Sequence, residues 1–199
     1  MEQIINEIVE IEWSMFQQTN NIGGRAWCQD DRRQFEINRR AQFSVWDENC
    51  LHSYLEDLRK AQQNGQNLVS LKYAYMMEHT SPAEFEAIRE QIPEVGEERQ
   101  QIIEQLLILT QEWCEAFSRD YPKLSRQGRP ITAPKGCGIT SVMTYAKGEM
   151  STYSLKTLNC LLALYRKYRE EKINLHEAVV GEELRQLSGR TLEQIEKQL

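Results

Sequence analysis

Apolar residues recur every three or four positions along nearly the whole chain, and this spacing most constrains the fold. Residues at such intervals share one face of an α-helix, so each segment predicts an amphipathic helix with one buried face. No run alternates apolar and polar residues as a half-buried strand would. The predicted helices cover 3–19, 31–42, 46–64, 68–76, 82–92, 97–119, 140–147, 152–171, 175–187 and 190–198. The sequence therefore predicts an all-α bundle of about ten helices.

The composition is that of a globular domain. The chain has 199 residues, of which 40% are hydrophobic and 27% charged, so it can bury a sizeable core. We expect one all-α domain over 1–199. No window approaches 18 uncharged apolar residues, so no membrane span is expected. Residues 1–12 carry acids in place of the basic and apolar segments of a signal peptide, which predicts a cytoplasmic protein.

Several partners and cofactors are disfavoured. The net charge of −6 argues against a nucleic-acid partner. The five cysteines form no C-x-x-C pair, so neither a disulfide framework nor a cysteine zinc site is supported. The chain has no Glu-x-x-His motif of a di-iron bundle, no dinucleotide-binding fingerprint and no phosphate loop. The sequence thus predicts no metal site and no cofactor.

The second half of the chain resembles the first. With an offset of 107 residues, 40–92 falls on 147–199 without a gap and with 11 identities in 53 positions. This alignment predicts an internal repeat, about 1–95 and 96–199, whose halves pack about a pseudo-two-fold axis. The alternative is that any two amphipathic helical stretches align passably. If the repeat is real, Glu12 and Glu112, Arg25 and Arg129, and Gln42 and Glu149 occupy paired positions near the axis.

Basic residues gather in two segments of this acidic chain. Residues 20–40 carry a net charge of +2 and residues 119–147 one of +5, which leaves −13 for the rest. Arginine binds carboxylate or phosphate through two parallel hydrogen bonds, so Arg25 and Arg129 are candidate anion clamps. The neighbouring glycines of 23–24 and 136–138 would let backbone amides approach a ligand. The alternative is that Arg25 and Arg129 form buried ion pairs with Glu12 and Glu112.

Other side chains could complete such a site. Cys28 lies near a predicted helix start beside two arginines, which would lower its thiol pKa, but no histidine is close in sequence to act as base. Its alternative role is that of a packed apolar residue. The candidate catalytic residues are Cys28, Glu12 and Glu112. The candidate ligand-binding residues are Arg25, Arg129, Gln29, Gln42, Trp46, Glu149 and Tyr153.

Several sequence words spread over 4–176 carry a family resemblance. They are Glu12-Trp13-x-Met15-Phe16, Asn21-x-Gly23-Gly24-Arg25-Ala26-x-Cys28-Gln29, Gln42-Phe43-Ser44-x-Trp46, Tyr54-Leu55-x-Asp57-Leu58, Gly128-Arg129-Pro130 and Gly148-Glu149-x-Ser151-Thr152-Tyr153-Ser154. Together they resemble a bacterial family known as a domain of unknown function. The resemblance implies a cytosolic protein that sometimes occurs beside, or fused to, a nucleotidyltransferase-like domain. It implies no reaction, so it assigns no catalytic role.

These observations favour a cytosolic helical protein with an arginine-lined polar cleft that binds, or converts, a small anionic metabolite. The alternative is a non-catalytic interaction module that docks on a nucleotidyltransferase-like partner. Binding of RNA through the basic segments is a weaker alternative.

Overall fold

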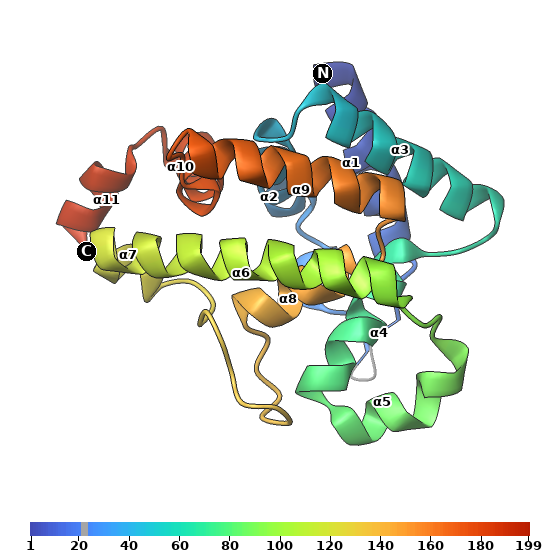
Figure 1. Ribbon diagram of the computed structural model, residues 1–199. Coiled ribbons are helices and arrows are strands. Elements are labelled where there is room, and N and C mark those ends of the chain that lie inside the picture. Colours follow the sequence, from blue (N-terminus) through green and yellow to red (C-terminus); the bar gives the residue numbers. More distant parts are fainter. Residues whose placement is uncertain (21–23) are drawn as a thin grey trace.

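Helices account for all the regular structure in the part of the chain that the computed structural model describes, residues 1–20 and 24–199 (Figure 1). This confirms the predicted all-α fold in one domain. The first half contributes α1 (Glu2–Gln17), η1 (Trp27–Gln29), α2 (Arg32–Ser44), α3 (Glu48–Gln63), α4 (Leu68–Thr80), α5 (Pro82–Ile88) and η2 (Arg89–Gln91). The second contributes α6 (Glu97–Asp120), α7 (Pro122–Ser125), α8 (Val142–Met150), α9 (Leu155–Glu170), α10 (Leu175–Ser188) and α11 (Leu192–Gln198).

Most helix starts are fixed by a polar side chain that accepts a hydrogen bond from a backbone amide of the first turn. Asp31 caps α2 in this way, with its carboxylate 3.0 Å from the amide of Gln34. The same geometry occurs at the starts of α3, α4, α8, α9, α10 and α11, at Asp47, Asn67, Ser141, Ser154, Asn174 and Thr191. At α5, Pro82 takes the first helical position, but the side chain of Ser81 makes no capping bond. A capping box there, which the Ser81–Glu84 spacing suggests, does not form.

One hydrophobic core joins the two halves. Its most deeply buried members include Ile8, Phe43 and Leu51 from the first half and Leu106 and Leu158 from the second. The long helix α6 runs alongside α9 in Figure 1, and the two are packed against each other. Neither half buries its apolar face alone, which explains why the chain forms a single domain.

Helices of one half pack on helices of the other in a reciprocal manner. Helix α4 packs on α8, α10 packs on α2, and α3 packs on α9. Under the 107-residue offset, α2 corresponds to α8, α3 to α9 and α4 to α10, so these contacts map onto one another. The pattern agrees with the expected repeat, while the pseudo-two-fold relation itself stays a prediction.

Gly148 sets how closely α8 approaches α4. A Cβ atom on this residue would lie 2.4 Å from Cγ of Met76 and 2.9 Å from the carbonyl oxygen of Lys72. Distances under about 3 Å are repulsive, so only glycine permits this crossing. The close packing holds the next residue, Glu149, against α2 in the middle of the fold.

Candidate functional site

Five polar side chains from both halves meet in the interior and form what we call the polar core: Glu12, Arg39, Gln42, Tyr54 and Glu149. Arg39 is only 4% exposed. Its Nε and Nη2 atoms bind the two carboxylate oxygens of Glu12 at 2.6 and 2.7 Å. The hydroxyl of Tyr54 donates to the same carboxylate at 2.6 Å. Glu12 is therefore held by three hydrogen bonds from α2 and α3.

The polar core crosses between the halves at Glu149. The third nitrogen of the guanidinium, Nη1 of Arg39, lies 2.7 Å from one oxygen of Glu149 and 2.7 Å from the amide oxygen of Gln42. The amide nitrogen of Gln42 donates to the other oxygen of Glu149 at 3.3 Å. The predicted meeting of Gln42 and Glu149 is thus observed.

The charges of the polar core are balanced by one more buried cation, Lys72. Burial alone would raise the pKa of Glu149, but the positive charges of Arg39 and Lys72 outweigh it and lower that pKa. Burial would lower the pKa of Lys72, yet Tyr145 and Glu149 raise it instead. Burial likewise opposes the charge of Arg39, and Glu12 and Glu149 more than offset it, so its pKa is raised. At neutral pH Glu149 is ionised and both cations are protonated.

Lys72 contacts the side chain of Tyr145. Its ammonium donates to the hydroxyl of Tyr145 at 2.8 Å and lies 4.5 Å from the centre of that ring. The guanidinium of Arg129 lies 5.5 Å from the centre of the same ring. Tyr145 therefore contacts two cations, which makes this side of the site favourable for negative charge.

A cavity of about 210 Å³ adjoins the polar core, and we call it the inner cavity. Five of the seven predicted ligand-binding residues line it: Gln42, Trp46, Arg129, Glu149 and Tyr153. Gln42 lies on α2 and Trp46 in the turn after it. Glu149 lies on α8 and Tyr153 in the turn after it, while Arg129 belongs to the segment between α7 and α8. Most of the remaining wall is apolar or aromatic, as is usual for small-molecule sites.

Tyr153 is the unusual member of this wall. Its side chain is 1% exposed, and its ring packs 5.9 Å from Trp46 and 4.9 Å from Tyr54, measured between ring centres. Its hydroxyl oxygen is buried and has no hydrogen-bond partner in the described part of the chain. Burial raises the pKa of this hydroxyl, and Glu149 raises it further, so the group is a neutral donor or acceptor. A buried polar group without a partner costs about 1–3 kcal/mol, which a ligand in the cavity could relieve.

Arg25 and Gln29 lie elsewhere. Nε of Arg25 forms an ion pair with Asp30 at 2.8 Å, and Nη2 donates to Gln17 at 2.6 Å. The side chain of Gln29 is buried and donates to the backbone of Phe16 and Thr19. Neither residue lines the inner cavity. The alternative of a buried ion pair between Arg25 and Glu12 does not form, because Glu12 is buried against Arg39.

The alternative ion pair between Arg129 and Glu112 does not form either. Glu112 is exposed on α6 and pairs with Arg169 at 3.4 Å, while Arg129 lies over Tyr145. The structure therefore brings neither Glu112 nor Cys28 to the inner cavity. Cys28 is partly buried and packs against the hydrophobic core.

The glycines of 136–138 have a structural task. The amide of Gly136 donates to the carbonyl of His79 at 2.8 Å, and the amide of Gly138 donates to that of Thr80 at 3.2 Å. Both glycines have positive φ angles, 79° and 74°, which other residues rarely adopt. These amides close the last turn of α4, so they are not directed at a ligand. Gly23 lies outside the described residues.

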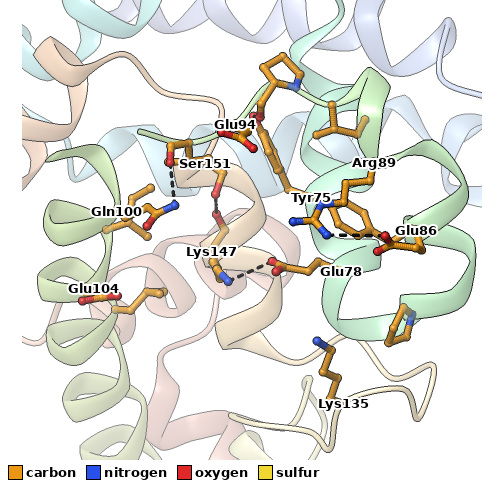
Figure 2. Close-up of a pocket in the computed structure, with 17 residues that line it drawn as sticks. Tyr75, Glu78, Glu86, Arg89, Glu94, Gln100, Glu104, Lys135, Lys147 and Ser151 are labelled. Atoms are coloured by element: carbon orange, nitrogen blue, oxygen red, sulfur yellow. Dashed lines mark hydrogen bonds and ion pairs between the residues drawn. The ribbon is translucent and has the colours of Figure 1, made fainter. Parts of the chain in front are cut away.

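A wider groove of about 640 Å³ opens on the surface between α4–α5 and α6 (Figure 2). Four of its seven charged side chains form ion pairs: Lys147 with Glu78 at 3.2 Å, and Arg89 with Glu86 at 3.6 Å. These paired groups are about half exposed or more, so their interactions are screened by solvent. None of the buried side-chain groups that lack a partner in the described chain lines this groove, and the inner cavity is therefore the better candidate site.

Three important residues were not among the predicted site residues: Arg39, Tyr54 and Lys72. Each lies on the apolar face of its helix, with Arg39 four residues after Phe35 and four before Phe43. Lys72 likewise falls between Leu68 and Met76 at the same spacing. A charged residue on a buried face needs a partner of opposite charge, and this was the signal available in the sequence.

The described ranges, 1–20 and 24–199, contain no group of three or more metal-binding side chains close enough to hold an ion. None of the helices in these ranges has the length and apolar character needed to cross a bilayer.

No curated protein and no solved structure shows significant similarity to the chain. A family model matches residues 2–197, which is nearly the whole sequence. The chain therefore belongs to the family described as protein of unknown function, DUF4125.

Proposed function

We propose that the protein binds a small organic anion in the inner cavity. The observation that carries this proposal is Tyr153, which lines the cavity and whose buried hydroxyl has no partner among the described residues. The surrounding polar groups of Gln42 and Glu149 are already bonded to Arg39. A ligand that reaches the hydroxyl of Tyr153 would supply the hydrogen bond that the fold leaves unmade.

The charge of the ligand follows from Arg129. It lines the cavity, forms no ion pair with any residue of the described chain, and stacks on Tyr145. The ammonium group of Lys72 lies 4.5 Å from the centre of the same ring. A carboxylate or phosphate at Arg129 would gain a charge-assisted hydrogen bond, and the rest of the ligand would pack between Trp46 and Trp113.

The test is native mass spectrometry of the protein purified from its host, followed by denaturation to release and weigh any bound molecule. Wild-type protein is expected to carry a small anion. Arg129→Gln and Tyr153→Phe are expected to lower its occupancy about tenfold, the effect of losing one hydrogen bond to a charged or buried group. Arg25→Gln is the matched control, since it removes the same charge from a residue that does not line the cavity.

Two results contradict the proposal. One is equal occupancy in Arg129→Gln, Tyr153→Phe and Arg25→Gln. The other is a wild-type protein that carries only water and whose thermal midpoint does not rise when a small-molecule extract of its host is added.

A second candidate function is docking on a nucleotidyltransferase-like protein. It is supported by Trp27, whose side chain is 77% exposed and lies beside Arg25 in sequence. Tryptophan and arginine are enriched at the centres of protein interfaces. If this candidate is right, Trp27→Ser abolishes co-purification of that partner and Arg129→Gln does not. Retention of the partner by Trp27→Ser would exclude this surface.

A further inference from the structure

A second cavity, of about 310 Å³, adjoins the inner cavity, and we call it the side cavity. It is lined by residues of α6, of α10 and of the segment that joins α7 to α8, which is the yellow loop in Figure 1. Arg129, Val142 and His176 contribute to the walls of both cavities. Six of the other ten wall residues of the side cavity are apolar: Cys114, Phe117, Leu124, Ile131, Val180 and Leu184.

Two residues of opposite charge line the side cavity. Arg129 supplies a guanidinium and Glu183 a carboxyl group, and both line the side cavity. No ion pair joins them, and within 1–20 and 24–199 neither pairs with any other charged residue. Unpaired charges on an apolar wall are costly, and a molecule that carries both complementary charges would satisfy them together.

Glu183 is held in place from α2. The amide of Gln34 approaches one carboxylate oxygen at 3.4 Å. The amide of Asn38, in the orientation that satisfies its neighbours, donates to that oxygen at 2.8 Å. Burial raises the pKa of Glu183, because no positive charge compensates its ionised form. A bound ammonium group would provide that compensation.

We propose that the side cavity binds an apolar α-amino acid. Its carboxylate binds Arg129, its ammonium group binds Glu183, and its side chain packs against Phe117 and Leu184. The volume suits a molecule of the size of leucine or phenylalanine. A plain carboxylate would leave Glu183 unpaired and a plain amine would leave Arg129 unpaired, so the zwitterion is preferred over either.

This proposal shares Arg129 with the proposed ligand of the inner cavity, so the two ligands would compete for one guanidinium. Glu183 does not line the inner cavity, and Tyr153 does not line the side cavity. The variants Glu183→Gln and Tyr153→Phe therefore separate the two sites, and the failure of one proposal leaves the other standing.

The test is isothermal titration of the full chain with L-leucine and L-phenylalanine. The same titration is made with 4-methylpentanoate, which lacks the ammonium group of leucine, and with 3-methylbutylamine, which lacks its carboxylate. Wild-type protein is expected to bind at least one of the amino acids, and to bind the leucine analogues about tenfold more weakly than leucine or not at all. Glu183→Gln keeps the shape and the hydrogen-bonding oxygen, and is expected to lose the preference for the amino acid over 4-methylpentanoate. Arg25→Gln is the control, because Arg25 lines neither cavity, and it is expected to bind the amino acids as wild type does. Tyr153→Phe is titrated in parallel to show which cavity holds the amino acid.

Three outcomes overturn the proposal. The first is no heat of binding from either amino acid at millimolar concentration, with the protein folded by circular dichroism. The second is unchanged amino-acid preference in Glu183→Gln. The third is loss of amino-acid binding in Tyr153→Phe alone, which would place the amino acid in the inner cavity.

Discussion

Nη1 of Arg39 lies 2.7 Å from the carboxylate of Glu149, and this contact ties α2 of the first half to α8 of the second. The other two nitrogens of the same guanidinium bind Glu12 on α1. One arginine thus holds three helices together in the interior. Both of its partners are almost completely buried, so neither can turn to water if Arg39 is removed.

We expect Arg39→Met to lower the free energy of unfolding by about 3–5 kcal/mol, the cost of leaving a buried charge without its partner. Urea denaturation followed by circular dichroism measures this. Arg32→Met is the matched control from the same helix, because Arg32 is half exposed and pairs with Glu10 and Glu36 at the surface. Arg32→Met is expected to change the free energy of unfolding only slightly. Equal effects of the two substitutions would show that the polar core does not stabilise the fold.

The fold was predictable because helix spacing is a local property. The apolar residues of α3 and α9 mark one face each, and Asn64-Gly65 marks the end of α3, where Gly65 adopts a φ of 66°. Such signals depend on neighbours three or four residues away, so they need no knowledge of the tertiary structure. The short helix α7 was missed, since a helix of four residues that begins at Pro122 is too short to carry a periodic signal.

The candidate site was predictable only in part. Gln42, Trp46, Glu149 and Tyr153 were selected because the 107-residue offset pairs them, and they do line one cavity. Arg25 was selected for its place in a glycine-rich segment, where the direction of a side chain does not follow from spacing. Its actual partner, Asp30, is only five residues away in the chain. The ligand-binding roles of Gln42, Trp46, Glu149 and Tyr153 stay predictions.

Gly148→Ala tests the close crossing of α8 and α4. The added Cβ would meet Met76 and the backbone of Lys72, and backbone cannot move aside cheaply. We expect a loss of about 1–3 kcal/mol in the free energy of unfolding, as for other overpacked sites. The displacement would also carry Glu149 away from Arg39.

Gly181→Ala is the control for this substitution, because it lies inside α10 and its added Cβ would make only ordinary contacts of 3.6 and 3.8 Å with Leu192. Removing a helical glycine there is expected to stabilise the protein by about 0.5–1 kcal/mol. A lower free energy of unfolding in Gly148→Ala and a higher one in Gly181→Ala would support the close packing of α8 on α4. An unchanged free energy of unfolding in Gly148→Ala would refute it.

The hydroxyl groups of two buried tyrosines, Tyr54 and Tyr153, are expected to contribute differently to stability. The hydroxyl of Tyr54 donates to Glu12 at 2.6 Å, so Tyr54→Phe is expected to lower the free energy of unfolding by about 1.5–3 kcal/mol. The hydroxyl of Tyr153 has no such partner within the described chain, so Tyr153→Phe is expected to leave stability unchanged or to raise it by up to about 1 kcal/mol. Chemical denaturation of the ligand-free proteins measures both. A destabilised Tyr153→Phe would mean that its hydroxyl already has a partner within the fold.

The buried imidazole of His176 is expected to make the stability of the protein depend on pH. Burial lowers the pKa of its imidazole from 6.5 to about 4, and its ring packs edge-on against Phe117 with 5.1 Å between ring centres. Between these two values the unfolded chain binds a proton at this residue and the folded chain does not. Stability from this residue is therefore complete above pH 6.5 and is lost as the pH falls toward 4.

The expected loss from this one residue is about 2 kcal/mol between pH 8 and pH 5. His176→Phe keeps a ring against Phe117 and removes the titrating group, so the fall in its unfolding free energy over this range should be smaller than that of wild type by this amount. The control is His52→Gln, which changes an exposed histidine of α3 near Glu48. Urea denaturation at pH 8, 6.5 and 5 measures all three proteins. If wild type and His176→Phe lose stability in parallel, the imidazole titrates in the folded protein as it does in water, and the wall it forms between the two cavities is open to solvent.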